Sequence, residues 1–307
     1  MEKVFVTGVT GKSGLYFLEE VIKNCADVRY SFTFLVRSKE KADFIKSKLP
    51  QSNICLASYD DEELLRKEFL KGYDILLHIA GIQSSLRMIK LAIDGDVKWL
   101  ILVHTTGIYS KYKAAGEMYR QIESKIDILL KDKNIAKTIL RPTMIYGTIN
   151  DRNVAVFMKM VYKLRLFPVV NGANYELQPV WCGDLGKAYF QVLTNSEVTK
   201  NKDYNLSGGS PILLIDMFKV MARKLGVGNR FVNIPFWVAY SGAWTVYVLT
   251  LGKFDFREKV QRLVEPRVFS HEEATTDFGY NPVCFEKGID GEIEEFKKRI
   301  GDVQIAK

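Results

Sequence analysis

The chain opens with MEKVFVTGVTGKSG (residues 1–14), and this stretch decides how the rest is interpreted. The apolar run Val4–Val6 predicts a strand, and apolar residues at helical spacing follow the last glycine. Between them lies a glycine-rich turn. Glycines let a backbone approach a pyrophosphate closely, and the N-terminus of the helix offers free N–H groups to the anion. The order of strand, turn and helix therefore predicts a dinucleotide-binding site.

A competing motif is excluded at one position. Gly11-Lys12-Ser13 looks like the end of a P-loop, whose pattern is GxxxxGK followed by Ser or Thr. That pattern requires a glycine five residues before Gly11, and Val6 stands there. The turn is therefore interpreted as a dinucleotide turn rather than a nucleoside triphosphate loop.

A second strand, Ser31–Val36, ends at Arg37. In a dinucleotide-binding fold the end of this strand faces the adenosine ribose. A carboxylate there binds the 2′-hydroxyl of NAD, whereas an arginine suits a 2′-phosphate. Arg37, together with Lys12 in the glycine turn, favours NADP over NAD.

Four more strands alternate with helices, the pattern of a parallel sheet with crossover helices. We therefore predict an α/β fold with a Rossmann-type doubly wound parallel sheet. Ligands of such sheets bind at the carboxyl ends of the strands. The additional strands are predicted at Asn53–Ala57, Asp74–Ile79, Val97–Val103 and Ala136–Leu140, with helices at Glu62–Leu70 and Ala114–Leu130. The strand ends place Gly11, Arg37, Ser58, Gly81, Thr105 and Pro142 at one edge.

The 307 residues are 47% hydrophobic, which suits a globular protein with a substantial core. We predict an NADP-binding core over residues 1–150. Residues 151–307 would form mainly a smaller substrate-binding part, with residues 170–195 returning to the core. The net charge of +8 is spread along helices, without a basic block interleaved with aromatics, so a nucleic-acid partner is not expected.

The cysteines and the start of the chain bear on its compartment. Four widely spaced cysteines without a CxxC pair argue against a metal site or a disulfide framework and fit a reducing compartment. The chain begins directly with a strand, so no signal peptide is expected. These features predict a cytoplasmic protein.

One segment, IPFWVAYSGAWTVYVLTLG (residues 234–252), carries no charge and is near the length of a membrane span. Its Pro, Gly, Ser and Thr content argues against a span. The favoured interpretation is a buried helix of the substrate-binding part. A hydrophobic lid over an apolar substrate, or a surface in peripheral contact with a membrane, is the alternative.

Five motifs in order resemble the extended or atypical short-chain dehydrogenases/reductases, which are related to NAD-dependent epimerases and dehydratases. The resemblance covers nearly the whole chain and implies a Rossmann domain with a smaller C-terminal substrate domain. Relatives often form homodimers through the helices after the fourth and fifth strands. The motifs are TGVTGKSG (7–14), HIAG (78–81), TILRPTMIYG (138–147), LQPVWCGDLGKAY (177–189) and TTDFGYNPVCFEKGI (275–289).

With the resemblance, the set of predicted cofactor contacts extends beyond the glycine turn. It adds residues at the ends of the fourth and sixth strands and two beside the adenine. The full set is Gly8, Thr10, Gly11, Lys12, Ser13, Gly14, Arg37, Ser58, Tyr59, Ala80, Gly81, Thr105, Pro142, Met144 and Ile145.

The family's chemistry requires a tyrosine acid/base, a lysine that lowers its pKa, and a Ser or Thr that orients the substrate oxygen. Thr105 matches the hydroxyl position. When Glu123 is matched to the glutamate of YxxxKxxxE, the lysine position holds Tyr119 and the tyrosine position holds Ala115. A literal YxxxK occurs at Tyr109 and Lys113, but out of register. The catalytic candidates are Thr105, Tyr109, Lys113, and Tyr119 in the place of the lysine.

The resemblance implies an NADP-dependent oxidoreductase or epimerase-like enzyme. Its substrate would be a small molecule, either a sugar nucleotide or an apolar carbonyl compound. Loss of the in-register pair leaves a second hypothesis open, a non-catalytic NADP-binding regulator or assembly subunit.

Overall fold

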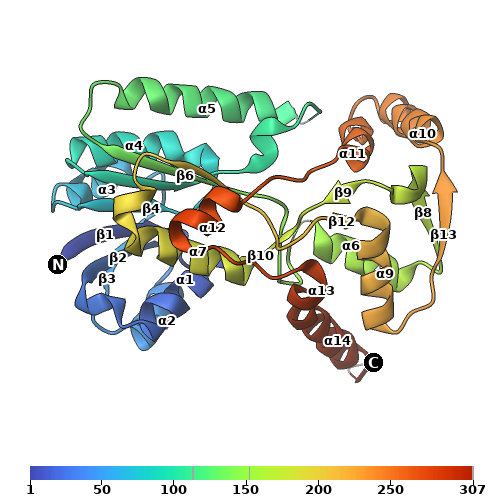
Figure 1. Cartoon of the computed structure of the whole chain (residues 1–307), viewed down its shortest axis with the longest axis horizontal. Coiled ribbons are helices and arrows are strands. Elements are labelled where there is room, and N and C mark those ends of the chain that lie inside the picture. The colour runs from blue at the N-terminus through green and yellow to red at the C-terminus, as the bar shows by residue number, and fades with distance from the viewer. Residues whose placement is uncertain (113, 152, 306–307) are drawn as a thin grey trace.

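A computed structural model describes residues 1–112, 114–151 and 153–305 (Figure 1). Its centre is a seven-stranded sheet in the order β11-β6-β5-β4-β1-β2-β3, and every neighbouring pair in it is parallel. The strand order reverses beside β1, which confirms the predicted doubly wound sheet. The strands are β1 (Glu2–Thr7), β2 (Tyr30–Val36), β3 (Asn53–Leu56), β4 (Ile75–His78), β5 (Trp99–Val103), β6 (Ala136–Pro142) and β11 (Asp203–Leu206).

Helices cover both faces of this sheet, and each face has its own apolar cluster. Their apolar stripes recur at helical spacing, so each helix buries one side against the strands. One face is covered by α1 (Lys12–Lys23), α2 (Lys39–Lys48), α7 (Cys182–Thr194) and α12 (Glu272–Phe278). The other is covered by α3 (Glu62–Phe69), α4 (Ser85–Asp94) and α5 (Ala114–Leu130).

A smaller part lies beyond the carboxyl ends of the strands, on the right of Figure 1. It has a third apolar cluster, centred on the contact between α6 and α9. Its helices are α6 (Val154–Lys163), α9 (Leu214–Leu225), α10 (Phe236–Leu249), α11 (Arg257–Leu263), α13 (Phe285–Gly288) and α14 (Asp290–Ile305). Its strand pairs are β8 (Leu166–Val170) with β13 (Arg230–Ile234) and β9 (Glu176–Leu177) with β12 (Ile212–Leu213).

The chain passes repeatedly between the two parts. After β7 (Ile145–Tyr146) it enters the smaller part, and β10 (Val180–Trp181) brings it back to pair with β7. It then forms α7, the short α8 (Ser196–Thr199) and the edge strand β11, which pairs with β6. The later helix α12 also packs on the central sheet. Both parts of the fold are therefore built from discontinuous stretches of sequence.

The apolar segment 234–252 does not form a buried helix, so the favoured sequence interpretation is wrong. Most of the segment is α10, in which Ala243 is the buried residue, whereas Trp237 is 71% exposed. The helix packs mainly on α11 and leaves its remaining surface to solvent. Its sequence cannot distinguish a buried helix from an exposed one, because the segment has no polar face that would indicate the side in contact with solvent. Within the described ranges, no helix is both long and apolar enough to cross a bilayer.

Helices α1 and α7, which cover the same face of the sheet, pack against each other at a glycine. Helix α7 lies against α1, and a Cβ on Gly186 would stand 2.4 Å from Cβ of Tyr16 and 2.6 Å from the backbone N of Phe17. Both distances are shorter than real contacts allow. Glycine at this position therefore sets how closely α7 approaches the helix that follows the glycine turn.

We expect Gly186→Ala to destabilise the protein by about 1–3 kcal/mol, because the added methyl group overpacks a backbone contact. Urea unfolding measures the loss. Gly242→Ala is the matched control, since it adds the same methyl group to a helix with open space around it and should be neutral or slightly stabilising. Equal effects of the two substitutions would contradict the packing argument.

Candidate functional site

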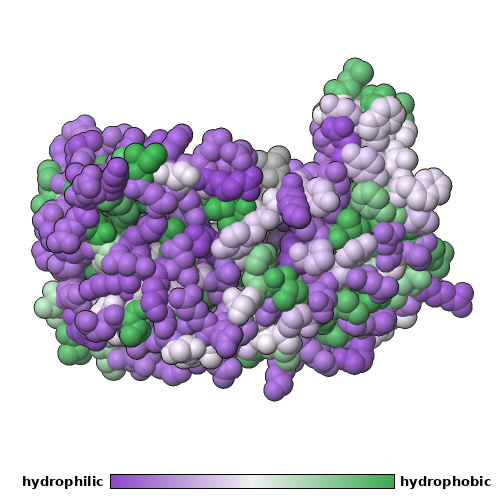
Figure 2. All heavy atoms as spheres, turned by 45° about the horizontal axis from the view of Figure 1, so that its top comes forward, coloured by the Kyte–Doolittle hydropathy of each residue, from purple (hydrophilic) through white to green (hydrophobic). Residues whose placement is uncertain are grey.

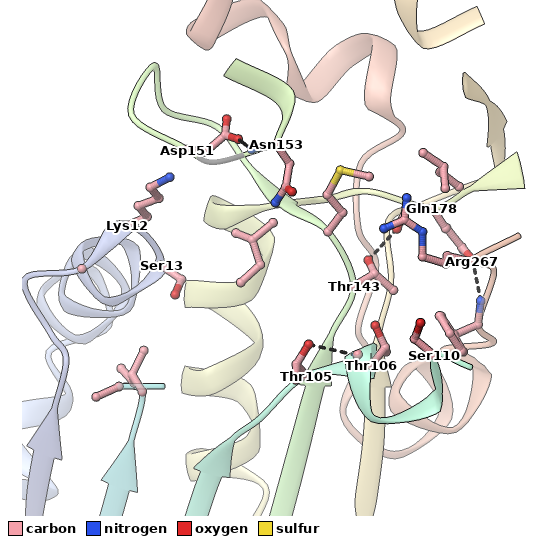
Figure 3. A pocket seen from close by; sticks show the side chains of 18 of the residues that line it. Lys12, Ser13, Thr105, Thr106, Ser110, Thr143, Asp151, Asn153, Gln178 and Arg267 are labelled. Carbon is pink, nitrogen blue, oxygen red and sulfur yellow. Dashed lines mark hydrogen bonds between the residues drawn. The ribbon is translucent and has the colours of Figure 1, made fainter. Parts of the chain in front are cut away.

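A cavity of about 1190 Å³ lies at the carboxyl ends of the central strands (Figure 3). The glycine turn lines one end of it, and the segment 262–269 of the smaller part lines the other. Small-molecule sites usually measure about 300–1,000 Å³. This cavity therefore has room for an extended ligand or for two ligands side by side.

The glycine turn is shaped for close approach of a phosphate group. Gly8 has φ of 78°, and a Cβ there would lie 2.7 Å from the backbone N of Ala80. A Cβ on Gly14 would lie 2.3 Å from the carbonyl oxygen of Gly8, so Gly14 supports the turn from inside the helix. Among the described residues, no side chain caps the N-terminus of α1, and the first turn of this helix contains no acidic residue. The start of α1 is thus an uncompensated N-terminus that favours an anion.

Two basic residues follow β2 and line the same end of the cavity. Arg37 is exposed, and Lys41 lies four residues further on, one turn into α2. The hydroxyl of Ser38 accepts a hydrogen bond from the N–H of Lys41 and begins the helix. Burial raises the pKa of Tyr59 across the cavity, although Thr7 and Arg37 act in the other direction, so this phenol is neutral at pH 7. An arginine, a lysine and a neutral ring together suit a phosphorylated ribose beside an adenine.

At the middle of the cavity, Thr105 follows β5 and begins the 3-10 turn η3 (Thr106–Tyr109). Its hydroxyl oxygen accepts a hydrogen bond of 3.0 Å from the N–H of Gly107, which leaves its proton free to donate. Thr106 Oγ1 donates to the carbonyl of Pro142 at 3.2 Å and ties this turn to β6. The hydroxyl of Thr105 is therefore held in place in the cavity wall (Figure 3).

A buried ionic network fixes α5 against the sheet edge below Thr105. Glu123 of α5 accepts from His104 Nδ1 at 2.9 Å and from Arg141 at 2.6 Å, and Arg141 also pairs with Asp203 at 2.9 Å. Burial would raise the pKa of Glu123, but the hydrogen bonds from His104 and Arg141 outweigh it and lower the pKa to about 2. The network links α5 to β6, to β11 and to the residue that follows β5.

Tyr119 lies outside the lining of the cavity. Tyr119 is buried in the apolar cluster with Ile122 and Ile126 and does not line the cavity. Ala115, at the position of the family's tyrosine, is also part of α5. Lys113 lies outside the described residues. The structure therefore offers neither of the family's usual side chains at the matched positions of this helix.

Tyr109 is the tyrosine candidate that does line the cavity. It is 48% exposed, and its hydroxyl donates to Asn205 Oδ1 at 3.3 Å. Its ring lies 5.9 Å from the guanidinium of Arg141 and 5.4 Å from the ring of Phe269. These contacts hold the ring, and the exposed hydroxyl can exchange a proton with a bound molecule.

The far end of the cavity contains a guanidinium that lacks a carboxylate partner. Arg267 points into the cavity in Figure 3 and, among the described residues, forms no ion pair; its Nε has no hydrogen-bond partner. Burial, and then the nearby Arg262, lowers the pKa of Arg267 to about 10, so it stays charged at pH 7. A buried unpaired charge is costly, and an anionic ligand would offset that cost.

Gln178 stabilises this end of the cavity. Its Oε1 accepts from the N–H of Phe269 at 3.2 Å, and its Nε2 donates to the carbonyl of Gly208 at 2.8 Å. Thr143 Oγ1 donates to the backbone carbonyl of Gln178. These bonds join the segment 262–269 to the end of β6.

The structure brings most of the predicted site residues into one cavity but not all of them. Ser58 instead makes a local turn, in which its N–H donates to Asp61 at 2.6 Å. The predicted residues that line the cavity are Gly8, Thr10, Gly11, Lys12, Ser13, Arg37, Tyr59, Ala80, Thr105, Tyr109, Met144 and Ile145. Those outside its lining are Gly14, Ser58, Gly81, Pro142 and Tyr119.

Several lining residues were missed by the sequence analysis. Lys41 carried little signal, because Arg37 precedes the helix that contains Lys41 and the two residues share no helix face. Arg262, Arg267 and Gln178 carried none, since only the fold brings them to the cavity.

Solved structures with this architecture include sugar-nucleotide epimerases and a quinone reductase. UDP-glucose 4-epimerase from Thermotoga maritima, with UDP-glucose, has a TM-score of 0.70 and 18% identity, covering 97% of this chain and 99% of that one. This chain has an extended short-chain dehydrogenase/reductase fold. An NADPH-dependent quinone oxidoreductase from Escherichia coli shares it, with a TM-score of 0.70 and 17% identity over 96% of this chain and 99% of that chain.

A third structure with this short-chain dehydrogenase/reductase fold is UDP-glucuronic acid 4-epimerase from Bacillus cereus with UDP-glucuronic acid and NAD. Its TM-score is 0.72 and its identity 14%, covering 97% of this chain and 99% of that one. The family resemblance drawn from the five motifs is thus confirmed as a fold.

In sequence, no family model matches the chain. A curated relative from Arabidopsis thaliana is 28% identical over 102 residues, which is 33% of this chain. It is named NADH dehydrogenase (ubiquinone) 1 alpha subcomplex subunit 9, mitochondrial, and the match spans a quarter of its length.

We expect Arg37→Asp to weaken NADPH binding at least about tenfold, because it replaces attraction for a 2′-phosphate by repulsion. NADH binding should be unchanged or improved. Isothermal titration with both nucleotides measures the effect, and Arg29→Asp, an exposed arginine outside the cavity lining, is the matched control. Equal loss of both nucleotides would contradict the assignment of Arg37 to the phosphate.

Proposed function

We propose that the protein binds NADP and acts as an oxidoreductase on a small molecule that carries an anionic group. The observation behind this proposal is the continuity of one cavity. It joins an uncapped helix N-terminus and two basic residues at one end, a positioned hydroxyl in the middle, and an unpaired guanidinium at the other. The helix N-terminus and the basic residues suit the phosphates of a dinucleotide. The hydroxyl and the guanidinium suit a second ligand beside the nicotinamide.

The preference for NADP rests on Arg37 and Lys41. The glycine turn would hold the pyrophosphate, as the cradle formed by Gly8 and Gly14 allows. The adenosine ribose would then lie at the end of β2, where the chain presents an arginine rather than the carboxylate that NAD-binding folds use. Lys41 adds a second positive charge within reach of the same phosphate.

The cofactor, when bound, supplies the transfer of a hydride to or from a carbon of the substrate. The chain's own residues would then handle the oxygen of that carbon. Thr105 donates its free proton in a hydrogen bond that orients the oxygen. Tyr109 gives up or accepts the proton that balances the hydride, and Asn205 Oδ1 holds its hydroxyl in position.

Arg267 and Arg262 indicate the substrate class. An arginine recognises phosphate or carboxylate with two parallel hydrogen bonds, and Arg267 has its donors uncommitted to a carboxylate among the described residues. A sugar nucleotide meets this requirement, as the UDP-glucose of the Thermotoga maritima structure would. The apolar walls formed by Leu177, Val268 and Phe269 also fit the apolar carbonyl compounds.

A second candidate function is a non-catalytic NADP-binding regulator or assembly subunit. The observation in its favour is that α5 carries Ala115 and the buried Tyr119 where the family has its tyrosine and lysine. The curated relative named as a subunit of NADH dehydrogenase agrees with this alternative. In that case the cofactor would stabilise the fold without turnover.

A turnover assay with a tyrosine variant separates the two functions. NADPH consumption is followed with a panel of quinones, small carbonyl compounds and UDP-sugars. For any substrate that turns over, we expect Tyr109→Phe to lower kcat by about 10²–10⁴-fold, because the proton donor is lost. Tyr162→Phe in α6 is the matched control and should leave kcat unchanged. Tight NADPH binding with no consumption across the panel would instead favour the regulator.

We expect Arg267→Gln to raise KM for an anionic substrate by about tenfold or more and to leave NADPH affinity unchanged. Steady-state kinetics with the anionic substrate, beside nucleotide titration, measures both values. An unchanged KM would show that the anionic group of the substrate lies elsewhere.

A further inference from the structure

Helix α10 and the segments beside it expose a group of large apolar side chains at one end of the molecule. In Figure 2 a projection with a hydrophobic tip rises at the upper right of the view, the end at which Figure 1 places α10 and α11. Monomeric proteins rarely expose contiguous apolar patches beyond a few hundred Å², and larger ones mark contact sites. The exposed large apolar residues of the region are Val232, Trp237, Val238, Trp244, Val246, Val248, Leu249, Leu251, Phe254 and Phe256.

The apolar surface extends around most of the helix. The inner side packs on α11 through residues such as Ala243 and Tyr247, and the ring of Tyr247 lies 3.9 Å beneath the guanidinium of Arg257. The remaining sides carry Trp237, Trp244 and Leu249 without a charged residue between them. A protein groove covers one stripe of a helix, whereas a lipid environment covers all of its free sides at once.

Aromatic and basic residues border this surface in the arrangement expected at a lipid headgroup layer. Trp and Tyr favour the membrane interface, and α10 has two of each. Lys253 and Lys259 follow the helix, and their ammonium groups lie 5.8 and 5.1 Å from the rings of Phe254 and Phe256. Of the other basic residues in 253–262, Arg257 pairs with Asp255 at 2.7 Å and Arg262 lines the main cavity. The charges of Lys253 and Lys259 complement an anionic lipid surface.

We infer that α10 inserts into one leaflet of an anionic membrane, with Lys253 and Lys259 at the headgroups. The helix has 14 residues and a length of about 21 Å, which is shorter than the roughly 30 Å of a hydrocarbon core. It therefore enters the membrane from one side without crossing it. The inference is independent of the proposed reaction, since α10 itself does not line the main cavity.

Insertion would also place the substrate end of the cavity close to the membrane. The chain leaves α10, forms α11, and contributes residues 262–269 to the cavity wall. A second, shallower hollow lies between α10, α11 and the start of α5, lined by Tyr240, Arg257 and Arg120 among others. The membrane-bound surface and the site wall are thus connected by one short stretch of chain.

Vesicle flotation tests this inference on the full chain. We expect the protein to float with vesicles of phosphatidylcholine and phosphatidylglycerol and to float poorly with phosphatidylcholine alone. Adding salt should weaken the binding, because screening acts on the lipid charge. Trp237→Glu with Trp244→Glu should reduce the bound fraction about tenfold or more, since each carboxylate is costly to insert.

The matched control adds the same two charges at exposed apolar positions elsewhere. Val28→Glu with Leu70→Glu changes residues that are 77% and 68% exposed in the larger part of the fold. This control should float like the unmodified chain. A comparable loss of binding in both double variants would show that net charge, rather than α10, drives the association and would overturn the inference.

Fluorescence locates the inserted side chains. Brominated lipids should quench the tryptophan emission of the unmodified chain, and Trp237→Phe with Trp244→Phe should keep flotation while losing most of the quenching. A protein that stays unbound to every vesicle would overturn the inference. If that unbound protein is a dimer which the glutamate variant dissociates, a second copy covers α10 instead.

Discussion

The backbone contact between α1 and α7 fixes the helical layer that covers one face of the central sheet. Helix α1 begins at the glycine turn, and α7 is the first helix after the chain returns from the smaller part. Because Gly186 has no side chain, the two helices meet backbone to backbone beside Tyr16 and Phe17. The glycine-turn end of the cavity is therefore held against α7 by close packing. Close-packed contacts transmit small displacements, so the position of the glycine turn depends on this contact.

The sequence predicted well whatever depends on local pattern. The strands up to β6, the glycine turn and the turn at Thr105 follow from short-range periodicity and from glycine geometry, and the structure has them where expected. The position of Arg37 could be predicted for the same reason, since the end of a strand determines where the next side chain lies. These features need no knowledge of distant contacts.

The parts that the sequence could not predict depend on contacts over long separations. Arg267 reaches the cavity because its backbone pairs with β9 beside Leu177, and no local pattern signals a contact over that separation. The exposure of α10 was only the alternative interpretation of the sequence, because an apolar helix has the same sequence whether neighbours cover it or not. Tyr119 was placed correctly in its helix, but its burial depends on an apolar cluster whose members come from distant segments of the chain.

The edge strand β11 has a consequence for how the chain can be divided. It completes the central sheet only after the chain has passed through the smaller part, and α7 and α12 cover the sheet from the same late stretches. A fragment ending near residue 150 would leave β6 as an unprotected edge and one apolar face partly bare, a surface prone to pair with other chains. Residues 1–150 therefore do not form a separable folding unit, and we expect a fragment limited to them to self-associate.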